Sequence, residues 1–252
     1  MKLFSIPNLF TLGNLLCGCL AIVFAFEGNL VWSAYLVGIA CVFDFLDGFL
    51  ARKLNQHSPI GKELDSLADM VTFGVVPGVV MYTFMEYIFN GIVPNFPKSD
   101  FHLIPFIGFL IPLFSALRLA KFNIDTRQSD SFIGVPTPAN AILICSLPLI
   151  TSFIDNKYSG EIVGFDHLVN QLITNYWFLI SLTVIMSILL IAEIPLFALK
   201  FKNFGWKGNE IRWSFLGLCV LLLATLQFVG IPLTIVLYIL MSVIHNLAKK
   251  KV

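Results

Sequence analysis

The chain has 252 residues, of which 58% are hydrophobic and 12% are charged, and its formal net charge is +1. Soluble domains carry about 25% charged residues, so this composition excludes an ordinary water-soluble protein and predicts an integral membrane protein. The chain contains no basic, aromatic-rich segment of the kind that binds nucleic acid, and we expect no nucleic-acid partner.

Apolar stretches long enough to cross a membrane recur along the whole chain. A spanning helix needs about 20 predominantly apolar residues. Such stretches occur, in chain order, at 8–26, 30–51, 66–90, 102–122, 138–154, 174–198, 213–229 and 231–247. The sequence therefore predicts an all-α integral membrane protein with about eight transmembrane helices.

The basic residues predict how these helices are oriented. Lysine and arginine accumulate in cytoplasmic loops. With the N-terminus inside, all of the 16 lysines and arginines except Lys98 and Lys157 fall on the cytoplasmic side. We therefore expect both termini to be cytoplasmic, with the first apolar stretch retained as a helix because no small-residue cleavage site follows it.

Four aspartates lie in or beside the second and third apolar stretches. They occur in the runs Asp44-x-x-Asp47-Gly48-x-x-Ala51-Arg52 and Gly61-x-x-x-Asp65-x-x-x-Asp69. An acidic residue at the centre of a spanning helix costs roughly 2.5–3.5 kcal/mol, so four of them require compensation by cations. Two magnesium or manganese ions would neutralise four carboxylates, which is the charge balance of a two-metal phosphoryl-transfer site.

Helical geometry brings the members of each run onto one stripe. At 100° per residue, positions three, four and seven residues after Asp44 lie within about 60° of it. The residues that share stripes in this way are Asp44, Asp47, Gly48 and Ala51 on one helix, and Gly61, Asp65 and Asp69 on the next. The short connection between the two helices predicts an antiparallel pair whose acidic stripes face each other, with small residues that let a ligand approach closely.

Two other interpretations of the aspartates are disfavoured. They could form buried ion pairs with Arg52, Lys53 or Lys121, but these are too few for four acids, and such pairs seldom repay desolvation. They could also line an intramembrane metal-ion or proton pathway. Acids in a pathway would be spread through the depth of the membrane, whereas these cluster towards one face.

The spacing Asp-x2-Asp-Gly-x2-Ala-Arg-x8-Gly-x3-Asp-x3-Asp resembles the signature of the CDP-alcohol phosphotransferases. Within that family, the blocks 6–11, 63–75, 117–123 and 132–138 are similar to the membrane-embedded bacterial phosphatidylserine synthases. The resemblance implies a six-helix catalytic core at 1–200, with two additional helices and a basic cytoplasmic tail at 201–252. It also implies a homodimer in the bacterial inner (cytoplasmic) membrane, among membrane lipids, with its active site on the cytoplasmic side.

The resemblance further implies transfer of a phosphatidyl group from CDP-diacylglycerol to L-serine, with release of CMP. Because the shared signature does not encode the acceptor, related transferases that use glycerol 3-phosphate or an inositol phosphate remain the near alternative. The implied metal ligands are Asp44, Asp47, Asp65 and Asp69, and Asp69 is also the implied base for the acceptor hydroxyl. The implied nucleotide-binding residues are Asn8, Thr11, Gly48, Ala51, Arg52 and Gly61, although Asn8 is equally suited to cap the first helix.

Arg118 and Lys121 stand one turn apart near the cytoplasmic end of the fourth helix. They could bind the serine carboxylate or the lipid phosphates, with arginine as the better bidentate partner, or they could simply anchor the topology. Glu193 matches no family position, and we interpret it as structural.

Overall fold

The computed structural model describes residues 3–56, 58–92, 103–125, 131–158, 160–197 and 205–249. Its α-helices are α1 (Ile6–Phe26), α2 (Leu30–Lys53), α3 (Pro59–Asp69), α4 (Val76–Ile92), α5 (Leu110–Ile124), α6 (Thr137–Lys157), α7 (Gly164–Ile173), α8 (Tyr176–Ile191), α9 (Glu210–Leu226) and α10 (Gly230–Lys249). A π-helix, η1 (Met70–Val75), joins α3 to α4, and short 3-10 helices η2 (Ile104–Phe109) and η3 (Gln227–Val229) precede α5 and α10. Strands β1 (Ser131–Ile133) and β2 (Pro195–Phe197) form one antiparallel pair.

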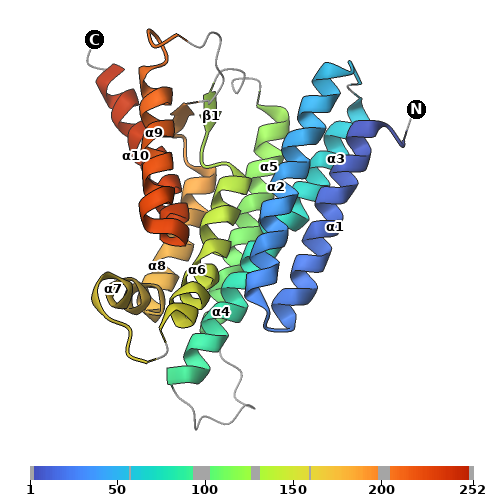
Figure 1. Cartoon of the computed structure of the whole chain (residues 1–252). Helices are drawn as coiled ribbons and strands as arrows, with labels where there is room; N and C mark the ends of the chain where they lie inside the picture. Colours follow the sequence, from blue (N-terminus) through green and yellow to red (C-terminus); the bar gives the residue numbers. More distant parts are fainter. Residues whose placement is uncertain are drawn as a thin grey trace.

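The predicted class, an all-α multi-pass membrane protein, is confirmed. Six helical stretches of the described chain are long and apolar enough to cross a membrane, or up to seven if the bent pair α7 and α8 forms one span. The last of the six, Glu210–Leu247, contains both α9 and α10, which pack against each other as a hairpin (Figure 1). The total of eight spans stays a prediction.

Two predicted spans have different boundaries in the structure. The third helix begins at Pro59 rather than at 66, because the Ser58 side chain accepts a hydrogen bond from the Gly61 amide at 3.0 Å and caps the helix. The stretch from Pro59 to Phe89 is 31 residues long, or about 46 Å at the helical rise of 1.5 Å per residue, so it extends well beyond the hydrocarbon layer. The sixth predicted span, 174–198, is instead shorter in the structure, because the helix ends at Ile191 and the chain then enters β2.

The start of α1 and the last turn of α10 lie at the same end of the bundle, whereas α7 lies at the opposite end (Figure 1). Helix α10 packs against α6 and is bonded to β2. The Tyr238 hydroxyl donates to the Phe197 carbonyl at 2.8 Å, and the Asn246 amide donates to the Pro195 carbonyl. Helix α10 is therefore hydrogen-bonded to β2, which comes before residue 200. The division of the chain into a catalytic core and two additional helices at residue 200 stays a prediction.

The backbones of α1 and η1 approach each other closely at a glycine. A Cβ atom on Gly18 would lie 2.3 Å from Thr72 Oγ1 and 3.1 Å from Thr72 Cα, so only glycine fits there. The Thr72 hydroxyl donates to the Asn14 carbonyl at 3.1 Å. The contact therefore fixes η1 against α1 directly after Asp69.

We expect Gly18→Leu to destabilise the protein, because the new side chain must push α1 away from η1, at a cost of about 1–3 kcal/mol for overpacking. The measurement is the midpoint of thermal unfolding in detergent. Gly38→Leu is the matched control, because a Cβ at Gly38 would meet nothing within 4 Å. Equal midpoints for the two variants would contradict this account of the contact.

Candidate functional site

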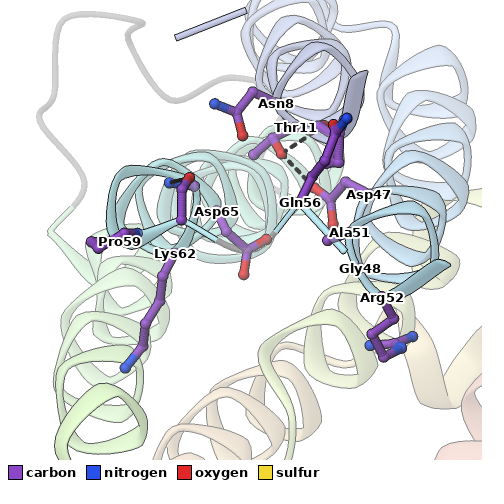
Figure 2. Close-up of a pocket in the computed structure, with 13 residues that line it drawn as sticks. Asn8, Thr11, Asp47, Gly48, Ala51, Arg52, Gln56, Pro59, Lys62 and Asp65 are labelled. Carbon is purple, nitrogen blue, oxygen red and sulfur yellow. Dashed lines mark hydrogen bonds between the residues drawn. The ribbon is translucent and has the colours of Figure 1, made fainter. Parts of the chain in front are cut away.

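Three carboxylates meet between α2 and α3. Asp44 and Asp47 come from α2 and Asp65 comes from α3, and one oxygen of each lies within 4.8 Å of the others. Figure 2 shows Asp65 extending from its helix towards Asp47. Asp65 Oδ1 is buried, and none of the described residues forms a hydrogen bond with it. Three hard oxygen donors at this separation, one of them without a partner, fit a divalent cation such as magnesium or manganese.

Asp69 lies one helical turn after Asp65, where α3 ends and the π-helix η1 begins. Its Oδ1 accepts a hydrogen bond of 3.2 Å from the Asn14 side-chain amide. It is not part of the group of three, but it lies within electrostatic range of Asp44 and Asp47. π-Helical turns are frequent at functional sites, and this one fixes the end of the acidic stripe. The structure thus brings the two predicted stripes together, while the individual roles of the aspartates stay predictions.

Helix α1 presents a polar stripe to these acids. Asn8, Thr11 and Asn14 are all buried and follow one another at intervals of three residues in an otherwise apolar helix. The Thr11 hydroxyl donates to Asp47 Oδ2 at 2.7 Å, and Asn14 supports Asp69. Asn14 was not among the site residues predicted from the sequence. The signal that would have found it is a buried amide that continues the spacing of Asn8 and Thr11.

A cavity of about 520 Å³ opens beside the carboxylates, within the usual size range of small-molecule sites. It is lined by Pro7, Asn8, Thr11, Asp47, Gly48, Ala51, Arg52, Gln56, Ser58, Pro59, Gly61, Lys62 and Asp65 (Figure 2). All six residues predicted to bind the nucleotide belong to this lining. A Cβ on Gly61 would lie 3.1 Å from Asn8 Oδ1, so a larger residue would crowd the wall.

Asn8 does not cap α1 through its side chain. The cap is Ser5, whose hydroxyl accepts a hydrogen bond of 3.4 Å from the Asn8 backbone amide. The Asn8 side-chain amide donates instead to the Leu3 carbonyl at 2.8 Å. The capping interpretation of Asn8 is therefore wrong, and its side-chain oxygen remains at the cavity wall.

The basic residues considered as ion-pair partners of the aspartates do not pair with them in the described part of the chain. Arg52 lies within electrostatic range of Asp47 but forms no ion pair with it, and the Lys53 ammonium lies 5.8 Å from the centre of the Phe49 ring. Lys121 pairs with Glu193. Across the described residues, no lysine or arginine forms an ion pair with any of the four aspartates. The buried ion-pair interpretation is therefore not supported.

Arg118 and Lys121 do not line the cavity beside Asp47 and Asp65. Arg118 is buried, its Nε–H donates to the Val135 carbonyl at 2.6 Å, and its guanidinium lies 5.6 Å from the centre of the Phe122 ring. It lies within electrostatic range of Asp69. The structure therefore places both cations on α5, outside the lining of the cavity, with Arg118 near Asp69 and Lys121 paired with Glu193.

The chain is similar to known proteins over most of its length. Residues 4–169 match the family described as CDP-alcohol phosphatidyltransferase. A protein of Helicobacter pylori named CDP-diacylglycerol–serine O-phosphatidyltransferase is 32% identical over 230 residues, which cover 90% of this chain and 83% of that protein. A Bacillus subtilis protein with the same name is 39% identical over 137 residues, covering 53% of this chain and 69% of the relative. The archaetidylserine synthase of Methanothermobacter thermautotrophicus is 34% identical over 149 residues, 58% of each chain. The chain belongs to the CDP-alcohol phosphatidyltransferase family.

Proposed function

We propose that this protein transfers a phosphatidyl group from CDP-diacylglycerol to L-serine and releases CMP. The observation that carries the proposal is the cavity, whose lining combines the carboxylates Asp47 and Asp65 with the small residues Gly48, Ala51 and Gly61. It offers a diphosphate-linked nucleotide both a place for metal ions and a wall without bulky side chains. The bacterial relatives described above carry the name of this activity.

Asp44, Asp47 and Asp65 would hold the divalent metal, with Asp69 completing a site for two ions. When bound, magnesium or manganese would neutralise charge on the diphosphate oxygens and on the departing CMP. Thr11 orients Asp47 through its hydrogen bond, and Asn14 does the same for Asp69. These two donors keep each carboxylate in one position, as outer partners of metal ligands do.

The chain's own contribution to the chemistry is proton transfer and positioning. Asp69 accepts the proton of the serine hydroxyl, whose oxygen attacks the phosphorus that carries the diacylglycerol. A bond forms between that oxygen and phosphorus, and the bond from phosphorus to the CMP oxygen breaks. CMP leaves with the electron pair. Arg118 and Lys121 contact the serine carboxylate or the lipid phosphates on the Asp69 side.

We place the site at the cytoplasmic face of a bacterial inner membrane, with both termini on that side. The lysine and arginine distribution supports this orientation, as does the common end at which α1 begins and α10 ends. Water-soluble serine and CMP exchange with the cytoplasm there, and the acyl chains stay among the membrane lipids. Residues 1–200 form the catalytic core, residues 201–252 add two helices, and the working unit is a homodimer.

An acceptor panel tests the function. Purified protein in micelles that contain CDP-diacylglycerol and magnesium should release CMP with L-serine, and not with glycerol 3-phosphate, an inositol phosphate or no acceptor. Release with a phosphorylated acceptor alone would replace serine in the proposal. An ion pathway instead predicts metal or proton flux into proteoliposomes that contain no CDP-lipid.

We expect Thr11→Val to weaken metal binding by about 10–100-fold, because the substitution keeps the shape of the side chain but removes the donor that orients Asp47. Manganese titration followed by electron paramagnetic resonance measures the dissociation constant. Thr183→Val is the control, since the buried Thr183 hydroxyl donates to the Leu179 carbonyl of its own helix, away from the four aspartates in the chain. Unchanged affinity in Thr11→Val would show that Thr11 does not support the metal site.

Asp69→Asn should lower the rate of CMP release by about 10²–10⁴-fold, because an amide cannot accept the serine proton. Substrate binding should persist, whereas Asp44→Asn and Asp47→Asn should also weaken the binding of metal and nucleotide. Turnover numbers and nucleotide dissociation constants separate these outcomes. Turnover of Asp69→Asn within a few-fold of the unmodified protein would exclude Asp69 as the base.

A further inference from the structure

An ion pair between Lys121 and Glu193 lies outside the part of the site described above. Lys121 is on α5, and Glu193 lies in the short segment between α8 and β2. Glu193 also lies beyond residue 169, where the family match ends. Both side chains remain accessible, since 34% of Lys121 and 59% of Glu193 is exposed. A small polar molecule can therefore reach both charges.

Helix α5 is held against the acidic helix α3 at this end of the bundle. Lys62, which lines the cavity, donates from its ammonium to the Asn123 carbonyl at 2.9 Å. The Asn123 side-chain amide donates to the hydroxyl of Ser66, the neighbour of Asp65, also at 2.9 Å. Lys121 therefore lies two residues from a double link to the helix that carries Asp65 and Asp69.

The segment that carries Glu193 is also fixed. The Gly134 amide donates to the Ile194 carbonyl at 3.0 Å, and the Val135 amide donates to the Leu189 carbonyl at 2.9 Å. The Val135 carbonyl in turn accepts the hydrogen bond from Arg118, one turn before Lys121 on α5. The backbone segments that carry the anion and the cation are thus both held by hydrogen bonds, and Lys121 lies one turn after Arg118, which is within electrostatic range of Asp69.

A cation and an anion side by side match the charges of an amino acid. The α-carboxylate and α-ammonium groups of serine are attached to one carbon, so a single molecule can contact both members of the pair. A lysine alone would attract any anionic acceptor, including a sugar phosphate. A neighbouring carboxylate repels a phosphate and favours an ammonium group.

We propose that Glu193, paired with Lys121, binds the ammonium group of an α-amino acid acceptor and thereby selects it over phosphorylated alcohols. Lys121 binds the carboxylate of the same molecule, and the acceptor hydroxyl points towards Asp69. The inference rests on the proposed function, since it assigns the acceptor specificity of the same site. It replaces our interpretation of Glu193 as merely structural.

The test compares Glu193→Gln with the unmodified protein in CMP-release assays. One set of assays varies L-serine, and a second measures inhibition by 3-hydroxypropionate, which keeps the hydroxyl and carboxylate of serine but lacks its ammonium group. We expect Glu193→Gln to raise the KM for serine by about three- to tenfold, a range limited by the exposure of Glu193. The kcat and the inhibition constant of 3-hydroxypropionate should change less than about twofold, since neither depends on contact with the ammonium group.

Two further variants make the result specific. Lys121→Gln should weaken serine and 3-hydroxypropionate alike, because it removes the carboxylate partner that they share. Asp166→Asn is the matched control, because it breaks the 2.5 Å ion pair with Lys157 near α7, at the opposite end of the bundle. It should leave all constants unchanged.

An unchanged serine KM in Glu193→Gln would overturn the inference, as would an equal weakening of serine and 3-hydroxypropionate, which would indicate a merely structural pair. Thermal unfolding of each variant identifies a loss of fold. If Glu193→Gln does not fold, Glu193→Asp, which keeps the charge but shortens the side chain, should raise the KM for serine alone. Absence of serine-dependent CMP release in the unmodified protein would contradict the proposed function instead, so the two failures are distinguishable.

Discussion

The arrangement of the whole bundle depends on four carboxylates held inside a membrane protein without an ion pair to any lysine or arginine among the described residues. Two acids on each of α2 and α3 repel one another in a medium of low dielectric constant, and burial makes each charge costly. Two polar side chains of α1 donate hydrogen bonds to these acids, the hydroxyl of Thr11 and the amide of Asn14. They orient two of the acids without neutralising them. The remaining negative charge is what a divalent cation would balance.

Close packing of α1, α3 and η1 follows from this need for short polar contacts. Thr11 and Asn14 reach the acids only because α1 approaches the acidic helices closely, and Gly18 makes that approach possible at η1. The same close approach brings Asn8 of α1 next to Gly61 of α3 in the lining of the cavity. Small residues therefore act twice, once to bring helices together and once to leave room for a ligand.

The sequence was sufficient to predict the features that one or two adjacent helices determine. Helical periodicity alone placed the two aspartate runs on facing stripes, because a five-residue connection leaves α2 and α3 few other arrangements. Features that depend on distant segments were not predicted. Asn14 acquires its role only when α1 packs against Asp69, and the end of α8 at Ile191 depends on the pairing of β2 with β1.

The residues proposed for phosphoryl transfer and those proposed for acceptor choice differ in the same way. The first group is close together in the sequence, whereas the second depends on distant segments. The acidic motif and the residues that line its cavity all lie within the first 70 residues, on α1, α2, α3 and the segments beside them. Members of a family can therefore keep this motif and still use different acceptors. The cations on α5 are instead positioned by partners far along the chain, Val135 for Arg118 and Glu193 for Lys121. Substitutions in those partners can change the charge pattern that an acceptor meets while the carboxylates stay as they are. In the function we propose, acceptor specificity can therefore change without disturbing the aspartates, so the signature motif alone does not identify the alcohol.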